Sequence, residues 1–412
     1  MDRTCISAAE VVIVGGGIGG LANAVALTRA GHRVTVLEQA AQFGEVGAGL
    51  QLAPNATRIL ARWGLLDEVI ARGVLPSRLV FRDAIDGAEL THLGLGADFR
   101  ARYGAPYVVI HRSDLHQILY AACQRAGVTL RTSATVTRID GGEHSATAVL
   151  PERSHEAAVV LVADGLWSQL RKPFSDDAAV CSGFAAYRGA VPIAELPIPR
   201  EDLAMQDVVV YFGPGCHLVQ YPLRGGEMFN QVAVFRSAAY SRGEADWGGP
   251  EELDGAFAQC HPKVRAALAT LWRDRHWPMF DRLPIEHWVD GRVALTGDAA
   301  HPMLQYLAQG ACQAIADAAN LAGHAAGAEP NWEAALAGYQ AERTAVTARV
   351  QRSARFWGET WHCDGLARTL RNALFRDREI TDYRYVDWLY AQSPSPAPVV
   401  PRSVARDPEK EA

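Results

Sequence analysis

Short apolar runs, each followed by a glycine-rich or polar turn, recur along the chain. Val11–Val14 is a β-branched run that predicts a buried strand, a helix-length stretch follows it, and Val34–Leu37 is a second apolar run. Ala158–Ala163 and Arg292–Thr296 have the same character. Because continuous apolar runs are typical of strands buried on both faces, these four segments predict one parallel sheet covered by helices.

Apolar residues at helical spacing predict the helices that cover this sheet. The stretches are His111–Ala126, for which Ser113 is a plausible N-cap, Cys312–Ala325 and Ala334–Trp357. Aromatic residues continue at helical spacing as far as Tyr390.

Two other regions, 77–110 and 182–288, change to short alternating runs separated by turn residues. That pattern predicts an antiparallel sheet outside the parallel one. Along one of its strands, the period of two places His217, Val219 and Tyr221 on a single face.

The fold class that follows is α/β, with a Rossmann-like parallel-sheet domain, an interleaved antiparallel β-sheet domain and a C-terminal helical region. The predicted boundaries are 1–76, 111–181 and 289–330 for the first domain, 77–110 and 182–288 for the second, 331–392 for the helical region and 393–412 for a disordered, proline-rich tail.

Three glycines follow the first strand at the spacing G-x-G-x-x-G. Gly15 suits the tight turn, Gly17 lets the backbone approach a pyrophosphate at the helix N-terminus, and Gly20 lets helix and strand pack closely. Glu38 ends the second strand, where a carboxylate can accept both hydroxyls of a ribose. Together these features predict a dinucleotide site. A βαβ unit that binds nothing is one alternative; a signal peptide or membrane span is disfavoured because no basic segment precedes the run and Asn23 interrupts it.

Further polar loops follow the other two apolar runs. Asp164 and Gly165 come after the third run, and Asp298 comes after the fourth. Parallel sheets bind ligands at the carboxyl ends of their strands, so both loops are predicted to face the same ligand. Arg112, at the start of a predicted helix, could reach a phosphate; a solvated surface arginine is an equal alternative.

Composition excludes several classes of function. Of 412 residues, 49% are hydrophobic and 21% charged, and 40 basic against 46 acidic residues give a net charge of −6. The sequence contains no run of five or more basic residues, so nothing in it suggests nucleic-acid binding. Seven cysteines without a C-x-x-C pair predict reduced thiols in a cytoplasmic protein, with no metal site.

The three loops GGGIGG, ADGLWSQLR and GDAAHP, in this order, resemble those of the class A FAD-dependent aromatic hydroxylases of the p-hydroxybenzoate hydroxylase fold. The resemblance spans nearly the whole chain. It implies that 1–76, 111–181 and 289–330 bind FAD and that 77–110 and 182–288 hold the substrate. It also implies Gly15–Glu38 at the ADP of FAD, Asp164 and Gly165 at FAD and transient NAD(P)H, Asp298 at the ribitol, Pro302 beside the flavin ring and Arg112 on the cofactor.

One departure from the broader family is informative. Most relatives have proline four residues after the histidine of GDAAH, where this chain has Gln305. The segments around Gln305, Cys216–Glu227, Trp247–Leu253 and Phe356–Glu359 resemble the 3-hydroxybenzoate 6-hydroxylase branch. That resemblance implies para-hydroxylation of 3-hydroxybenzoate to gentisate with NADH and O2, through a flavin C4a-hydroperoxide, in a homodimer without a membrane span. It implies His217 and Gln305 as catalytic residues, with Tyr107 and Tyr221 near the substrate ring.

The chemistry of a phenol suits these residue types. A phenol has a pKa of about 10 and histidine about 6.5, so a neutral His217 can accept the hydroxyl proton as general base. Gln305 can donate and accept, and can therefore orient the hydroxyl, the carboxylate or the bound oxygen. Tyr107 and Tyr221 are equally well interpreted as core aromatics.

Other functions remain open at this stage. One is a salicylate- or hydroxynicotinate-type hydroxylase, which Gln305 disfavours. A flavin dehydrogenase or oxidase would insert no oxygen. A binding module of the same architecture, like the escort proteins for prenylated GTPases, would carry no flavin.

Overall fold

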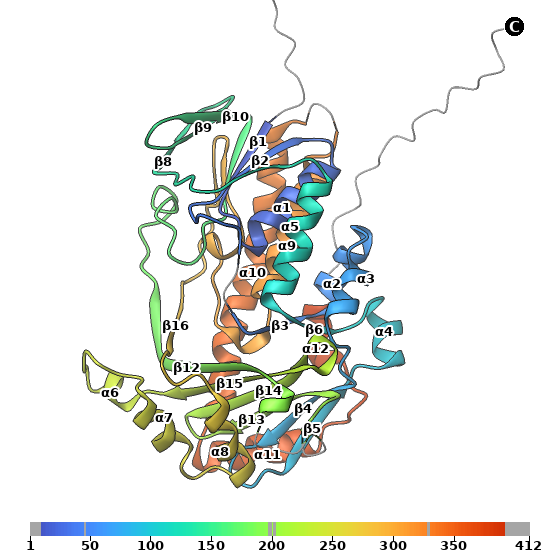
Figure 1. The fold of residues 1–412 in the computed structure, drawn as a ribbon, viewed down its shortest axis with the longest axis vertical. Helices are drawn as coiled ribbons and strands as arrows, with labels where there is room; N and C mark the ends of the chain where they lie inside the picture. Colours follow the sequence, from blue (N-terminus) through green and yellow to red (C-terminus); the bar gives the residue numbers. More distant parts are fainter. Residues whose placement is uncertain (1–9, 45–46, 197–199, 201–202, 328–329, 392–412) are drawn as a thin grey trace, which may run out of the picture.

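The computed structural model describes residues 10–44, 47–196, 200, 203–327 and 330–391. Two lobes are stacked along the long axis, with the parallel sheet and its helices in one and a large, mostly antiparallel sheet in the other (Figure 1). The predicted α/β fold class is confirmed. Within the described residues, no helix is long and apolar enough to cross a membrane. The predicted tail, 393–412, lies outside them.

A six-stranded sheet forms the centre of the first lobe. Its order is β17 (Val289–Asp290), β18 (Val293–Leu295), β11 (Val159–Val162), β1 (Glu10–Val14), β2 (Arg33–Leu37) and β7 (Thr129–Arg131). All neighbours pair in parallel except β17 and β18. The strands β18, β11, β1 and β2 are the four predicted apolar runs, and their carboxyl ends bring the three polar loops to one edge.

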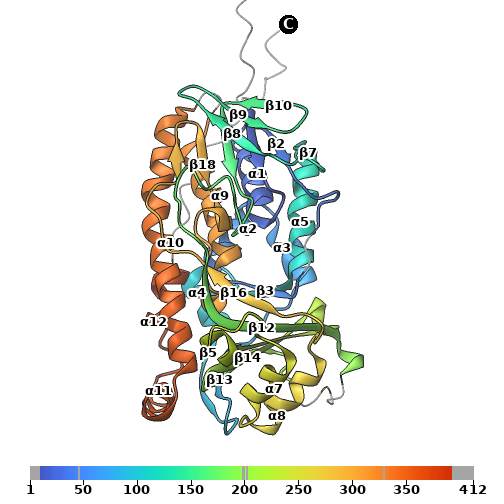
Figure 2. The ribbon, with the colours of Figure 1, turned by 90° about the vertical axis from the view of Figure 1, so that its left-hand side faces the viewer.

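Four helices cover this sheet or extend beyond it: α1 (Ile18–Arg29), α5 (Arg112–Arg125), α9 (Gly310–His324) and α10 (Trp332–His362). Helix α1 packs against α5 and α9, and α9 packs against α10. Figure 2 shows α10 running along one side of the molecule from the first lobe to the second, where it contacts β13 and β14. It ends five residues later than the predicted Trp357, and this extension proves important for the site.

The second lobe is built on a seven-stranded sheet. Its order is β16 (Trp277–Asp281), β12 (Val180–Pro192), β15 (Met228–Arg236), β14 (Cys216–Leu223), β13 (Asp207–Gly213), β4 (Arg78–Asp83) and β5 (Glu89–Gly94). All pairs are antiparallel except β13 with β4. Facing residues such as Ala186, Val234 and His217 are in register across β12, β15 and β14 and therefore share one face.

The remaining elements are shorter. Two small sheets consist of β3 (Gly49–Leu52) with β6 (Val108–His111), and of β10 (Ser154–Ala157), β9 (Ala146–Val149) and β8 (Arg138–Gly141). The other helices are α2 (Pro54–Arg62), α3 (Leu66–Arg72), α4 (Ala97–Tyr103), α6 (Ala238–Ser241), α7 (Pro250–Phe257), α8 (Pro262–Ala267), α11 (Gly365–Arg376) and α12 (Arg384–Tyr390).

Local details differ from the sequence predictions in two places. The N-cap of α5 is His111, whose side chain accepts from the backbone N–H of Ser113, so the assignment of Ser113 as the cap was wrong. Tyr107–Ile110 was grouped with the antiparallel region, yet β6 pairs with β3 instead. The domain boundaries stay a prediction.

Candidate active site

A cavity of about 1010 Å³ lies where the two lobes meet. Most of the predicted site residues line it: Gly15, Gly17, Glu38, Tyr107, Arg112, Asp164, Gly165, His217, Tyr221, Asp298 and Gln305. Two do not. Gly20 supports the loop from behind, and Pro302 is buried beside the cavity with its carbonyl oxygen accepting from Gln351 Nε2 at 3.1 Å.

The first loop has a shape that only glycine permits. Gly15 has φ +107°, and a Cβ there would lie 2.4 Å from the carbonyl oxygen of Ala163. A Cβ on Gly20 would lie 1.9 Å from the carbonyl oxygen of Gly15. Gly17 is the N-cap of α1 and supplies no capping side chain, so the first-turn N–H groups remain for a ligand. This cradle fits the pyrophosphate of a dinucleotide.

Glu38 is fixed at the end of β2 by two backbone groups. Its Oε2 accepts from Gly16 N at 2.7 Å and its Oε1 from Ala40 N at 2.8 Å. Each carboxylate oxygen retains a second lone pair, so the group can still accept ribose hydroxyls at the cavity wall.

Asp164 and Gly165 follow β11 with the backbone turned at Gly165, whose φ is +88°. The Oδ1 atom of Asp164 is buried without a hydrogen-bond partner among the described residues, and burial raises the pKa of this carboxyl group. A buried unpaired acceptor is costly, so Asp164 fits a ligand that donates hydrogen bonds.

Arg171 joins the second loop to the third. It is buried, and its Nη1 donates to the carbonyl oxygens of Ala299 and Ala300, each at 2.7 Å. The loop that carries Asp298 is therefore held from one side by the segment that follows Asp164.

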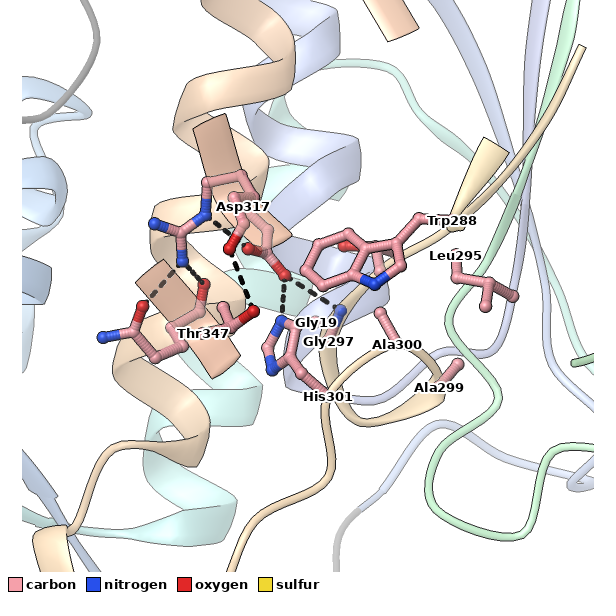
Figure 3. Close-up of polar contacts among 12 residues, drawn as sticks. Gly19, Trp288, Leu295, Gly297, Ala299, Ala300, His301, Asp317 and Thr347 are labelled. Carbon is pink, nitrogen blue, oxygen red and sulfur yellow. Dashed lines mark hydrogen bonds and ion pairs between the residues drawn. The ribbon is translucent and has the colours of Figure 1, made fainter. Parts of the chain in front are cut away.

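Asp317 of α9 holds the third loop from the other side (Figure 3). Its Oδ2 accepts from Gly297 N at 3.0 Å and from His301 Nε2 at 2.6 Å, and its Oδ1 accepts from Arg343 Nε at 2.7 Å. Burial alone would raise the pKa of Asp317. The neighbouring His301 and Arg343 have the opposite and larger effect, so the pKa is lowered to about 2. His301 therefore shapes the loop, and it does not line the cavity.

Asp298 lies beside the start of a helix. A single 3₁₀ turn, η5 (Gly297–Ala299), contains this residue, and α9 begins at Gly310, where an added Cβ would lie 3.9 Å from Asp298 Oδ1. Asp298 is exposed and faces the cavity.

The second lobe contributes one face of its large sheet to the cavity. Most of these side chains are apolar, and the polar exceptions include His217, Tyr221 and Arg188. The predicted common face of His217, Val219 and Tyr221 is confirmed. Burial lowers the pKa of His217 to about 3, so its imidazole is neutral at pH 7.

Three other polar side chains, Tyr107, Tyr221 and Gln305, line the same cavity. Tyr107 donates from its hydroxyl to Gln51 Oε1 at 2.7 Å. The ring of Tyr221 packs on Gly49, where a Cβ would lie 2.4 Å from Tyr221 Cε2. Gln305 opens the 3₁₀ turn η6 (Gln305–Leu307), and its side-chain amide has no hydrogen bond to the described residues, so it is available to a ligand.

Sequence patterns missed Arg188 on β12. Its Nε is buried without a partner among the described residues, and its guanidinium lies 5.5 Å from the centre of the Trp277 ring. Burial lowers the pKa of this arginine, with the nearby Arg112 adding to the effect. The alternation of the 183–191 run could have placed Arg188 on one face, but only strand pairing shows that this face is the one with His217.

The chain matches known proteins over most of its length. Residues 8–354 match the family described as FAD binding domain. A 3-hydroxybenzoate 6-hydroxylase of Polaromonas naphthalenivorans is 40% identical over 386 residues, covering 92% of this chain and 95% of that protein. One from Klebsiella oxytoca is 38% identical over 390 residues, covering 92% and 96%.

Solved structures show the same fold. Klebsiella pneumoniae HpxO complexed with FAD and uric acid has a TM-score of 0.79 at 25% identity, covering 90% of this chain and 93% of that one. A salicylate hydroxylase substrate complex has a TM-score of 0.77 at 22% identity, covering 94% and 96%. The predicted FAD cofactor is confirmed, and the chain belongs to the FAD binding domain family as an FAD-dependent aromatic monooxygenase.

Proposed function

We propose that this enzyme converts 3-hydroxybenzoate to gentisate, 2,5-dihydroxybenzoate, with NADH and O2. Two relatives named 3-hydroxybenzoate 6-hydroxylase support the substrate, at 40% and 38% identity over most of the chain. The observation that carries the proposal is His217, a neutral imidazole on an apolar cavity wall whose Nε2 has no partner among the described residues.

His217 is the proposed general base. Oxygen insertion needs an electron-rich ring, and a phenolate donates electrons far better than a phenol, most strongly at the ortho and para positions. When His217 Nε2 accepts the hydroxyl proton, the new imidazolium lies beside the phenolate. Their attraction in a low-dielectric cavity offsets the burial that otherwise disfavours the charged imidazole. Attack para to the hydroxyl then gives the 2,5-dihydroxy product.

Arg188 is the proposed partner of the substrate carboxylate. It is the only charged side chain that the described strands of the large sheet contribute to the cavity. Its Nε is buried without a hydrogen-bond partner among the described residues, which is costly, and a bound carboxylate would supply charge-assisted hydrogen bonds.

Gln305, Tyr107 and Tyr221 are the proposed orienting groups. The unpaired amide of Gln305 can donate to a carboxylate or accept from a hydroxyl. Burial raises the pKa of both tyrosines, so they remain neutral and act as hydrogen-bonding or packing groups.

The glycine loop with Glu38, the Asp164 loop and the Asp298 loop would hold FAD, with Arg112 beside it. Bound FAD would supply the redox chemistry, because it can accept a hydride from NADH and activate O2. Only one complete glycine fingerprint occurs in the sequence, so we propose that NADH binds transiently and without a second Rossmann domain.

The proposal is tested by supplying the FAD-loaded enzyme with NADH and each of the three hydroxybenzoate isomers, and by identifying the products chromatographically. Gentisate formed from 3-hydroxybenzoate in proportion to NADH consumed is the expected result. Efficient turnover of 2-hydroxybenzoate instead would favour the salicylate-type alternative, and oxidation without a hydroxylated product would favour an oxidase.

We also propose a cytoplasmic homodimer. Leu366, Leu370 and Leu374 are 75%, 56% and 71% exposed and lie at intervals of four residues on one face of α11. Such a stripe is suited to burial against a second copy. Light scattering should give twice the chain mass, and Leu370→Glu should shift the population toward the monomer. The cysteine pattern supports a reducing compartment.

A further inference from the structure

The side chain of His217 makes its one polar contact within the described residues with a second histidine. The Nδ1 atom of His217 lies 2.8 Å from Nε2 of His362, the last residue of α10. The rings stack with their centres 5.0 Å apart and an angle of 27° between them. His217 lines the cavity and His362 does not, so the second histidine lies behind the proposed base.

Both rings are neutral at pH 7. Burial lowers the pKa of His217 to about 3. Burial also lowers the pKa of His362, and the positive charges of Arg236 and Arg371 lower it further. A neutral imidazole has one N–H and one lone pair, so the contact between the rings contains a single proton.

That proton can lie on either ring, and its position decides whether His217 Nε2 can accept a proton from the substrate. If His362 Nε2 carries it, His217 accepts at Nδ1 and its Nε2 is an N–H that cannot accept from a phenol. If His217 Nδ1 carries it, His362 accepts, and the lone pair of His217 Nε2 is available to the cavity. Only the second arrangement makes His217 a base.

We propose that His362 is a positioning residue: its Nε2 accepts the Nδ1–H of His217 and so keeps the lone pair of His217 Nε2 available to the substrate hydroxyl. This inference rests on the proposed base role of His217. When the substrate proton arrives at Nε2, the bond from Nδ1–H to His362 remains and stabilises the imidazolium.

The charges around His362 also decide where the proton stays. A transfer onward from His217 Nδ1 would create a cation on His362, and the cations Arg236 and Arg371 oppose it. The substrate proton is therefore held on His217 Nε2, and the pair does not act as a relay that carries it away.

Three variants separate this role from packing. His362→Gln keeps an acceptor oxygen near the position of Nε2, whereas His362→Leu removes it. Phe184→Leu is the matched control, because the Phe184 ring stacks on His362 at 4.5 Å but forms no part of the contact with His217. The backbone carbonyl of His362, which accepts from Gly215 N at 3.0 Å, is unaffected by any of them.

The first readout is the tautomer of His217 in the FAD-loaded protein, from ¹⁵N imidazole shifts assigned by comparison with His217→Gln. We expect Nδ1 protonated and Nε2 bare in the wild type, in His362→Gln and in Phe184→Leu. A wild-type His217 protonated at Nε2 would overturn the proposal, even if no His362 variant folds. This readout needs no substrate, so its outcome is independent of whether 3-hydroxybenzoate is turned over.

The second readout is the ultraviolet difference spectrum of 3-hydroxybenzoate bound without O2 or NADH, which distinguishes phenol from phenolate. We expect the bound phenolate-to-phenol ratio to fall at least tenfold in His362→Leu and to be largely restored in His362→Gln. An unchanged ratio in His362→Leu, or an equal fall in Phe184→Leu, would contradict the role of His362.

Discussion

The two ends of the cavity are built in different ways. At the glycine-loop end, the backbone forms the binding surface, through the turn at Gly15, the close approach at Gly20 and the open start of α1. At the sheet-face end, side chains form the binding surface. His217 and Arg188 come from strands that are separated by β15, and most of the side chains around them are apolar. An added side-chain atom at the first end should therefore disrupt the binding loop. A substitution at the second end should leave the fold intact and reduce only substrate binding or catalysis.

The largest effect is expected for Gly20→Ala. The new Cβ would lie 1.9 Å from the carbonyl oxygen of Gly15, so the first loop must be displaced. We expect protein purified without flavin, measured by the ratio of flavin to protein absorbance. Gly255→Ala is the control, because it lies in α7 with no heavy atom within 4 Å of the added Cβ. Full flavin content in Gly20→Ala would refute the account of the backbone-built end.

His217→Gln tests the sheet-face end. Loss of a general base should slow hydroxylation by about 10²–10⁴-fold while FAD stays bound and NADH is still oxidised, with more hydrogen peroxide released. The measurements are product yield per NADH and peroxide formed. His92→Gln changes a histidine of β5 that does not line the cavity and should behave as wild type. Wild-type rate and yield in His217→Gln would exclude its role as the base.

Asp317→Asn tests the support of the loop that carries Asp298. Removing one partner of a buried ion pair leaves Arg343 uncompensated, which typically costs about 3–5 kcal/mol of unfolding free energy. The urea midpoint should fall accordingly. Asp140→Asn breaks an exposed pair with Arg138 and should leave the midpoint unchanged. Equal midpoints for the two variants would show that the network does not support the loop.

The low pKa of Asp317 also predicts that the free energy of unfolding decreases at acid pH. Its pKa is about 2 in the folded state against 3.8 for the free side chain, so the unfolded chain takes up the proton first as the pH falls. The stabilisation is present above about pH 4 and is lost as the pH approaches 2; it amounts to about 2.5 kcal/mol. Urea titrations at several pH values should show this loss in the wild type and a smaller one in Asp317→Asn.

Arg188→Met is expected to have a moderate effect confined to anionic substrates. A hydrogen bond to a charged group contributes about 1.5–3 kcal/mol, so the dissociation constant of 3-hydroxybenzoate should rise about 10- to 100-fold. Neutral 3-hydroxybenzyl alcohol serves as the matched ligand and should bind both proteins equally. An equal loss for both ligands would indicate that Arg188 has a structural role.

The contrast between the two ends also explains how much the sequence could predict. The glycine loop and Glu38 occupy one continuous stretch, because a βαβ unit brings its own ends together. The order of the three loops along one sheet edge followed from their positions after apolar runs. Resemblance to a family supplied His217 and Gln305, and the period of two placed His217 correctly on its face.

The rest depends on packing between distant segments. His362 lies 145 residues beyond His217, and no local pattern relates them. The predicted end of α10 fell short of this residue because the aromatic spacing gives no clear stop signal; the helix ends at His362, with Cys363 as its C-cap. Arg188 required the pairing of β12 with β15, and Asp317 looked like one polar residue in an apolar helix until its three partners were placed together.

The central claim is that this cavity inserts one oxygen atom para to the hydroxyl of 3-hydroxybenzoate. The most direct measurement is mass spectrometry of the product formed with NADH under isotope-labelled O2. The account predicts gentisate that carries one labelled oxygen atom at the new hydroxyl. Gentisate without label, a product hydroxylated at another ring position, or peroxide with no hydroxylated product would contradict it.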